Sequence, residues 1–297
     1  MRDTPKKATC LYLILTLAFS SVFWALIIWS GHLGSGFDVL VYGVMWCPAL
    51  AALASCRILG RGFRSLAWRW PEGRYVALAY FLPLAYAAIA YGAVWGMRLG
   101  GWNAGFVGQV SHGFGLRGMP AWGALVLYLV LTPSVGMVRS VASALGEEVG
   151  WRGFLVPELA KQMSFTKLSL LSGIIWAAWH SPILLFADYN AGTNRWYGLA
   201  CFAVMVVSQC FIFAWLRLKS GSLWAGALLH ASHNLFVQQI FDQLMRDTGR
   251  TRWYTTEFGI GLALASAALA VYFWTRRAEV EQRAMGDEPS KVVAAFN

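Results

Sequence analysis

Eight apolar stretches, each about as long as a bilayer is thick, constrain the fold of this chain more than any other feature. A helix needs about 17–25 apolar residues to cross the hydrocarbon core. With 297 residues, of which 58% are apolar, the chain has no room for a sizeable soluble domain. We therefore predict an all-α, polytopic transmembrane bundle of about eight spans. The predicted spans are residues 10–29, 38–56, 75–97, 121–147, 168–186, 198–216, 222–241 and 258–275.

The basic residues between these stretches predict the orientation of the protein. Cytoplasmic loops carry an excess of Lys and Arg, and most of the 24 Lys and Arg residues fall on one side if the N-terminus is inside. We expect both termini to be cytoplasmic in a multi-pass protein, of the inner membrane if the chain is bacterial. We interpret the net charge of +10 as this topology signal, with some attraction to anionic lipid, rather than as a nucleic-acid-binding surface.

Two adjacent carboxylates stand at the end of the fourth stretch, although only 13% of the residues are charged. Ionised groups at bilayer depth cost about 2.5–3.5 kcal/mol each, so they are rare there and usually functional. Adjacent helical residues face different directions, whereas residues four apart are neighbours. We expect Glu148 to pair with Arg152, which leaves Glu147 free to act as a general base on water. The alternative is that Glu147 is a second structural carboxylate.

The segment that contains these carboxylates should form a bent helix and then turn back. As one straight helix from Ala121 to Lys161 it would be about 60 Å long, about twice the hydrocarbon thickness. Glu147 and His180 are almost equally far from a turn near residues 161–166, so two antiparallel arms would place them at a similar depth. We therefore interpret His180 as a partner of Glu147 rather than as a packing residue. The candidate positions for the bend are Pro133, Gly146, Gly150 and Gly153.

A further polar cluster, His230-Ala-Ser-His-Asn234, lies in the seventh stretch. His230 and Asn234 are four residues apart on one helical face, and both can donate hydrogen bonds to the oxyanion of a tetrahedral intermediate. The alternative is a polar pair that joins two helices. His233 points partly away from this face, and we interpret it as a structural hydrogen-bonding residue.

The same side chains allow a metal-dependent alternative. Glu147, His180 and His230 could ligate Zn²⁺ and leave an open position for a water molecule. The chain contains no H-E-x-x-H sequence, and its five cysteines have no metal-type spacing. We therefore favour a site without a metal or another cofactor, and keep zinc as the alternative.

Taken together, the clusters resemble the motifs of the CPBP family of intramembrane proteases, also called the CAAX-processing type II or abortive-infection family. The family pattern is E-E-x-x-x-R, then F-x-x-x-H, then H-x-x-x-N/D on successive motif-bearing spans. Trp176 stands where the family usually has Phe. We interpret this as the exchange of one aromatic residue for another at a packing position, which affects the shape of the pocket rather than the catalytic residues. In this chain the motifs read Glu147-Glu148-Val-Gly-Trp-Arg152, Trp176-Ala-Ala-Trp-His180 and His230-Ala-Ser-His-Asn234.

The resemblance implies an endopeptidase that hydrolyses a peptide bond of a membrane-associated protein or peptide, reached from the cytoplasmic side. Glu147 and His180 would activate the attacking water, and His230 and Asn234 would stabilise the oxyanion. Glu148 and Arg152 would support the helix end. The protease core would cover residues 121–241, between N-terminal helices (1–120) and a last span with a cytoplasmic tail (242–297).

A non-catalytic membrane protein is the alternative from another class: a transporter, or a binding or immunity protein. A transporter often shows internal repeats with broken helices, and we find no such repeats. A pseudo-enzyme would most simply lack a motif residue, and none is missing. The expected partners are a membrane-tethered substrate and the lipid bilayer, and the sequence predicts neither the substrate's identity nor an oligomeric state.

Overall fold

The computed structural model of the chain describes residues 4–31, 38–113, 119–190 and 192–281, and most of them are helical. Strands β1 and β2 pair antiparallel, with Gly101 opposite Arg246. The elements are α1 (Pro5–Ser30), α2 (Asp38–Ile58), the 3₁₀ turn η1 (Phe63–Leu66), α3 (Gly73–Gly96), β1 (Gly101–Trp102), α4 (Ala104–Gly113), α5 (Ala121–Leu131), the π-helical segment η2 (Thr132–Gly136), α6 (Met137–Glu148), the π-helical segment η3 (Val149–Leu155), α7 (Val156–Ala160), α8 (Phe165–Phe186), α9 (Arg195–Ser220), α10 (Leu223–His233), the π-helical segment η4 (Asn234–Phe241), α11 (Asp242–Leu244), β2 (Met245–Arg246), the 3₁₀ turn η5 (Thr251–Trp253) and α12 (Ile260–Thr275).

All of the predicted apolar stretches fall on helices, which confirms the all-α class. The stretch 222–241 falls on α10 and η4, and the stretch 258–275 falls on α12, whose 16 residues are fewer than the about 20 of a typical crossing. The number of crossings and the side on which the termini lie therefore stay predictions. Six helical runs among the described residues have the length and composition of a membrane span: Pro5–Ser30, Val39–Ile58, Gly73–Gly96, Ala121–Ala160, Phe165–Phe186 and Arg195–Ser220.

The run from Ala121 to Ala160 extends over 40 residues and contains two of the π-helical segments. Pro133 lies in η2, and Gly150 and Gly153 lie in η3, where the sequence predicts interruptions. Proline has no N–H to donate and its ring clashes with the preceding turn, so a wider turn accommodates it. Glu147 and Glu148 are the last two residues of α6, directly before η3.

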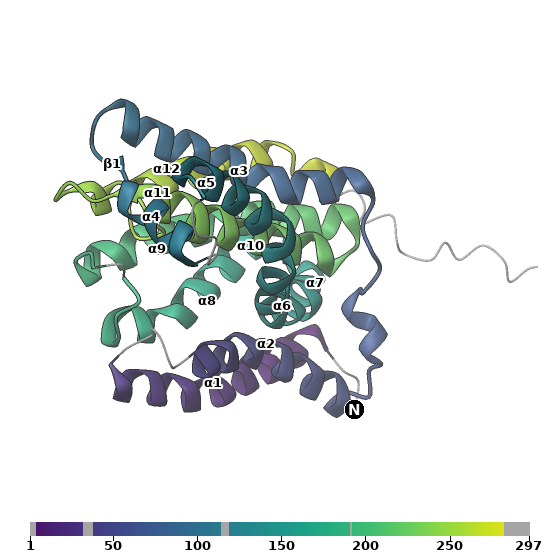
Figure 1. Ribbon diagram of the computed structural model, residues 1–297. Coiled ribbons are helices and arrows are strands. Elements are labelled where there is room, and N and C mark those ends of the chain that lie inside the picture. Colours follow the sequence, from purple (N-terminus) through teal and green to yellow (C-terminus); the bar gives the residue numbers. More distant parts are fainter. Residues whose placement is uncertain (1–3, 32–37, 114–118, 191, 282–297) are drawn as a thin grey trace, which may run out of the picture.

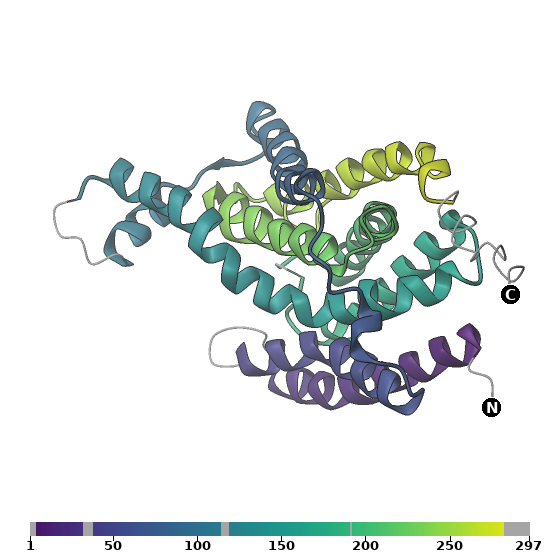
Figure 2. The same ribbon diagram turned by 90° about the vertical axis from the view of Figure 1, so that its right-hand side faces the viewer.

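The helices are arranged so that the three motifs meet inside the molecule. The pair α1 and α2 forms a layer on one side, at the bottom of both views (Figures 1 and 2). Helix α10 lies centrally and packs against α3, α6 and α9, while α8 packs against α9. The start of α1 and the end of α12 lie at the same end of the molecule (Figure 2).

Glycines set the close spacing of the helices around the motifs. A Cβ on Gly173 of α8 would lie 2.7 Å from the Cα of Val207 on α9. A Cβ on Gly150 would lie 2.5 Å from the Cβ of Pro48 and also 2.5 Å from the hydroxyl oxygen of Tyr12. Real Cβ atoms do not approach other heavy atoms so closely, so both positions require glycine for this packing.

Candidate active site

A cavity of about 210 Å³ brings the predicted catalytic residues together. Glu147 of α6, His180 of α8, His230 of α10 and Asn234 of η4 all line it. Ile27 of α1 and residues of α2 line it on the side of the α1–α2 layer. The volume is large enough for more than one water molecule, since one molecule needs about 10–15 Å³ of such space.

Glu147 is held at the cavity wall by two indole groups. Its side chain is buried, and Oε2 accepts hydrogen bonds from Nε1 of Trp176 at 2.7 Å and from Nε1 of Trp151 at 3.2 Å. Buried carboxylates need donors of this kind, because burial removes their hydration. The two bonds fix one oxygen of Glu147.

Trp176 therefore does more than fill space, which corrects the interpretation of this position as a packing position. Its indole ring is buried against Phe213 and His230, as expected for an aromatic residue in a core. Its N–H group, however, donates the shorter of the two hydrogen bonds to Glu147. A phenylalanine has no such donor, so the departure from the family pattern changes the environment of the carboxylate itself.

The hydrogen bonding of His180 defines which of its nitrogens is free. Nδ1 lies 3.0 Å from the backbone oxygen of Trp176. A carbonyl oxygen can only accept, so Nδ1 carries the proton and Nε2 of the neutral ring has the lone pair. His180 thus presents an acceptor for a water molecule from the wall of the cavity that Glu147 also lines.

Glu148 and Arg152 form the expected ion pair, with Nη1 of Arg152 at 2.8 Å from Oε1 of Glu148. Glu148 and Arg152 are 0% and 1% exposed, respectively, and neither belongs to the cavity lining. The guanidinium also lies over the ring of Phe213, 3.7 Å from its centroid. The adjacent carboxylates are therefore in different environments, Glu147 at the cavity and Glu148 behind it.

Glu148 has a second contact that the sequence did not suggest. Its Oε1 lies 3.0 Å from Nδ1 of His230, so the carboxylate bridges Arg152 and His230. A carboxylate oxygen only accepts, so Nδ1 of His230 carries a proton, and a second proton on Nε2 gives the imidazolium form. In that form Nε2 of His230 is a donor, which is the state that oxyanion binding requires.

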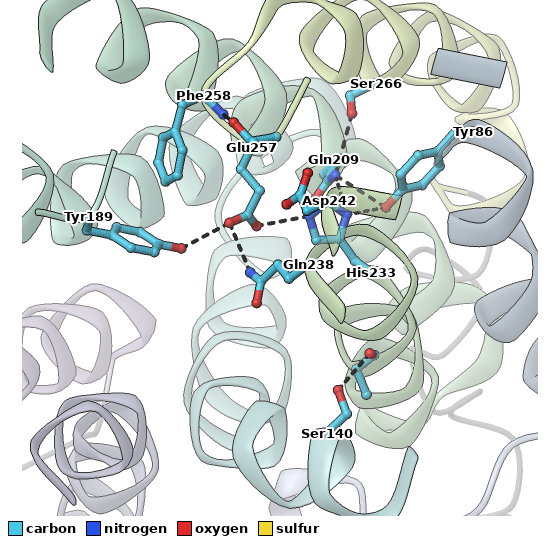
Figure 3. Close-up of polar contacts among 12 residues, drawn as sticks. Tyr86, Ser140, Tyr189, Gln209, His233, Gln238, Asp242, Glu257, Phe258 and Ser266 are labelled. Carbon is cyan, nitrogen blue, oxygen red and sulfur yellow. Dashed lines mark hydrogen bonds and ion pairs between the residues drawn. The ribbon is translucent and has the colours of Figure 1, made fainter. Parts of the chain in front are cut away.

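A second polar network, not anticipated from the sequence, forms another part of the cavity wall around Glu257 (Figure 3). Oε1 of Glu257 lies 3.0 Å from Nε2 of His233, and Oε2 accepts from Nε2 of Gln238 at 2.9 Å and from the hydroxyl of Tyr189 at 3.2 Å. His233 thus makes structural hydrogen bonds, as predicted, but it also lines the cavity. Glu257 stands in a connection beside a predicted span, and no local motif marks it.

The residues of the zinc alternative do not form a ligand set in the structure. In the described part of the chain, no three His, Cys, Asp or Glu side chains lie so as to hold a metal ion.

Comparisons with known proteins agree with the placement of the motifs. Residues 120–236 match the family described as Type II CAAX prenyl endopeptidase Rce1-like. A protein of Methanococcus maripaludis named CAAX prenyl protease 2 is 30% identical over 137 residues, which cover 44% of this chain and 46% of that protein. The chain thus matches about half the length of this curated relative.

Proposed function

Because residues 120–236 belong to the Rce1-like type II CAAX prenyl endopeptidase family, we propose that this chain is an intramembrane endopeptidase. The observation that carries the proposal is the cavity that Glu147, His180, His230 and Asn234 line together. These residues come from three separate helical runs, and a cavity in an apolar core is an uncommon place for them to gather. Their donors and acceptors match the needs of peptide hydrolysis.

In the proposed first step, Glu147 takes one proton from a water molecule, and Nε2 of His180 accepts a hydrogen bond from the hydrogen that remains and so orients the molecule. The water oxygen forms a bond to the carbonyl carbon of the scissile peptide. The π electrons of the carbonyl move to its oxygen, which becomes an oxyanion. Nε2 of His230 and the side-chain amide of Asn234 donate hydrogen bonds to that oxygen.

In the second step, the oxyanion re-forms the carbonyl and the bond to nitrogen breaks. Protonated Glu147 returns its proton to the departing nitrogen, which leaves as an amine, and the other product is a carboxylic acid. Glu148 acts through His230, because its carboxylate stabilises the charged imidazole that donates to the oxyanion. It is a positioning residue in this scheme.

The substrate proposed is a protein or peptide tethered to the membrane. The curated relative is named CAAX prenyl protease 2, and a lipid-anchored segment would reach a site that lies among membrane helices. The cavity lining is largely apolar, with Ile27, Val44 and Ile183 among it. We therefore expect an apolar residue on at least one side of the scissile bond.

The experiment is cleavage of a membrane-tethered peptide library by the purified protein in nanodiscs, with and without a strong chelator. Site-specific cleavage that is unchanged by chelator supports hydrolysis by a glutamate-activated water. Activity that chelator removes and Zn²⁺ restores would instead support the zinc alternative. No cleavage of any peptide would contradict the enzymatic proposal and favour a non-catalytic binding protein.

A further inference from the structure

Glu257 is a buried carboxylate whose hydrogen-bond donors are uncharged. It is 7% exposed and lies in the connection between η5 and α12. Tyr189 and Gln238 are neutral donors. The third donor is Nε2 of His233, and the contact that Nδ1 of the same ring makes decides whether the ring is charged. The amide nitrogen of Gln209 lies 3.2 Å from Nδ1 of His233. An amide N–H can only donate, so Nδ1 is an acceptor and the ring of His233 is neutral.

The three donors keep Glu257 ionised. Burial by itself disfavours the charged form of a carboxyl group, but the three hydrogen bonds that Glu257 accepts favour it. An ionised carboxylate has about four acceptor positions. Among the described residues, donors occupy one position on Oε1 and two on Oε2, which leaves one acceptor position on Oε1.

In the cavity that Glu257 lines, the one group assigned a positive charge is the imidazole of His230, and it pairs with Glu148 rather than with Glu257. Glu147 and Glu257 are both in its wall, and none of the lining residues, all from the described part of the chain, is Lys or Arg. Arg152 lies behind the wall and is paired with Glu148. A buried anion without a countercharge is costly and favours any cation that can reach it.

We propose that Glu257 determines specificity by binding a cationic side chain, Lys or Arg, of the substrate close to its scissile bond. This inference rests on the proposed peptidase function, since the cation belongs to the same peptide that Glu147 attacks. The ammonium or guanidinium group donates to the open position on Oε1 of Glu257. Its charge balances the second carboxylate of the cavity.

The test separates binding from cleavage. The peptides are tethered to the membrane and carry Lys, Arg, Met or Gln at each position around the cleaved bond. Their affinity is measured by titration onto the Glu147→Gln protein, which lacks the proposed catalytic base. The same peptides are cleaved by the wild-type protein. We expect Lys or Arg at one position to improve both affinity and kcat/KM by about tenfold to a hundredfold, as hydrogen bonds to charged groups typically contribute.

Two variants test whether Glu257 causes the preference for Lys and Arg. Glu257→Gln removes the charge and should abolish the preference for Lys and Arg over Met. Gln238→Lys keeps Glu257 and places a cation beside it, so it should abolish the same preference even if the first variant folds poorly. Glu72→Gln alters an exposed carboxylate outside the cavity and should leave the preference intact.

The outcomes distinguish this inference from the proposal on which it rests. Equal affinity for Lys and Met peptides at every position, or a basic preference that survives in both variants, would overturn the role of Glu257. A basic preference in binding that both variants lose would support that role even if no peptide were cleaved. In that case only the peptidase proposal would fail.

Discussion

Arg152 is a charged side chain from which the fold excludes water almost completely, with 1% of its surface exposed. Its partners are Glu148, the thiol of Cys210 at 3.5 Å and the faces of Trp176 and Phe213. Because Glu148 also contacts His230, these contacts connect the end of α6 to α10. The Glu148–Arg152 ion pair is therefore expected to stabilise the fold and to support His230 as a hydrogen-bond donor.

Arg152→Ala should destabilise the protein strongly, because it leaves the buried carboxylate of Glu148 without its guanidinium partner. Breaking a buried pair in this way costs about 3–5 kcal/mol. Thermal unfolding of the detergent-solubilised protein measures the loss. The matched control is Arg74→Ala, which removes an exposed partner of Glu72 and should cost about 0–1 kcal/mol. Similar losses in the two variants would contradict the assigned role of the buried pair.

Trp176→Phe tests the indole hydrogen bond to Glu147 while keeping an aromatic ring. A hydrogen bond to a charged group contributes about 1.5–3 kcal/mol, so kcat should fall about tenfold or more in a folded protein. Trp151→Phe removes the longer bond to the same oxygen and should have the smaller effect. Wild-type kcat in Trp176→Phe would show that the ring matters only for packing, as the sequence suggested.

At the scale of elements, the site depends on how closely the motif-bearing helices approach one another. Ser140 of α6 donates to the backbone oxygen of Ala231 on α10 at 2.8 Å, which ties together the helices that carry Glu147 and His230. Gly173 permits the contact of α8 with α9. The position of His180 relative to the rest of the cavity therefore depends on glycine packing as well as on its own hydrogen bond.

Gly173→Ala should destabilise the protein and reduce activity, because the added Cβ meets the backbone of α9 rather than a flexible side chain. Overpacking of this kind typically costs about 1–3 kcal/mol. Gly92→Ala on α3 is the matched control, since nothing lies within 4 Å of its added Cβ. It should leave the unfolding temperature unchanged or slightly raised, as alanine favours helix over glycine. Equal behaviour of the two variants would contradict the packing argument.

At the scale of the whole molecule, the periodic and compositional signals predicted the helices well, but not all of the cavity. Apolar length located the long helices, and Pro133, Gly150 and Gly153 marked two of the π-helical segments, because these signals act within a few residues. Neither signal marked α4 or the π-helical segment η4. Glu257 was missed because its role comes from contacts with His233 and Tyr189, 24 and 68 residues away. Spacing along one helix cannot reveal such a contact.

The predicted orientation of the molecule is tested by labelling of single cysteines with a membrane-impermeant reagent. Arg64→Cys lies in the basic connection before α3, and Trp196→Cys lies at the exposed start of α9. In a Cys10→Ser background, we expect the first to react only from the cytoplasmic side and the second only from the other. Labelling of Arg64→Cys from the outside would reverse the assigned topology.

The central claim, that Glu147 activates the attacking water, is tested most directly by single-turnover cleavage of one tethered peptide. The Glu147→Gln protein keeps the shape of the side chain and loses the base. We predict a rate about 10²–10⁴-fold below wild type, the usual contribution of a general base, with an unchanged unfolding temperature and wild-type activity in Glu72→Gln. A Glu147→Gln protein that cleaves at the wild-type rate would contradict the account.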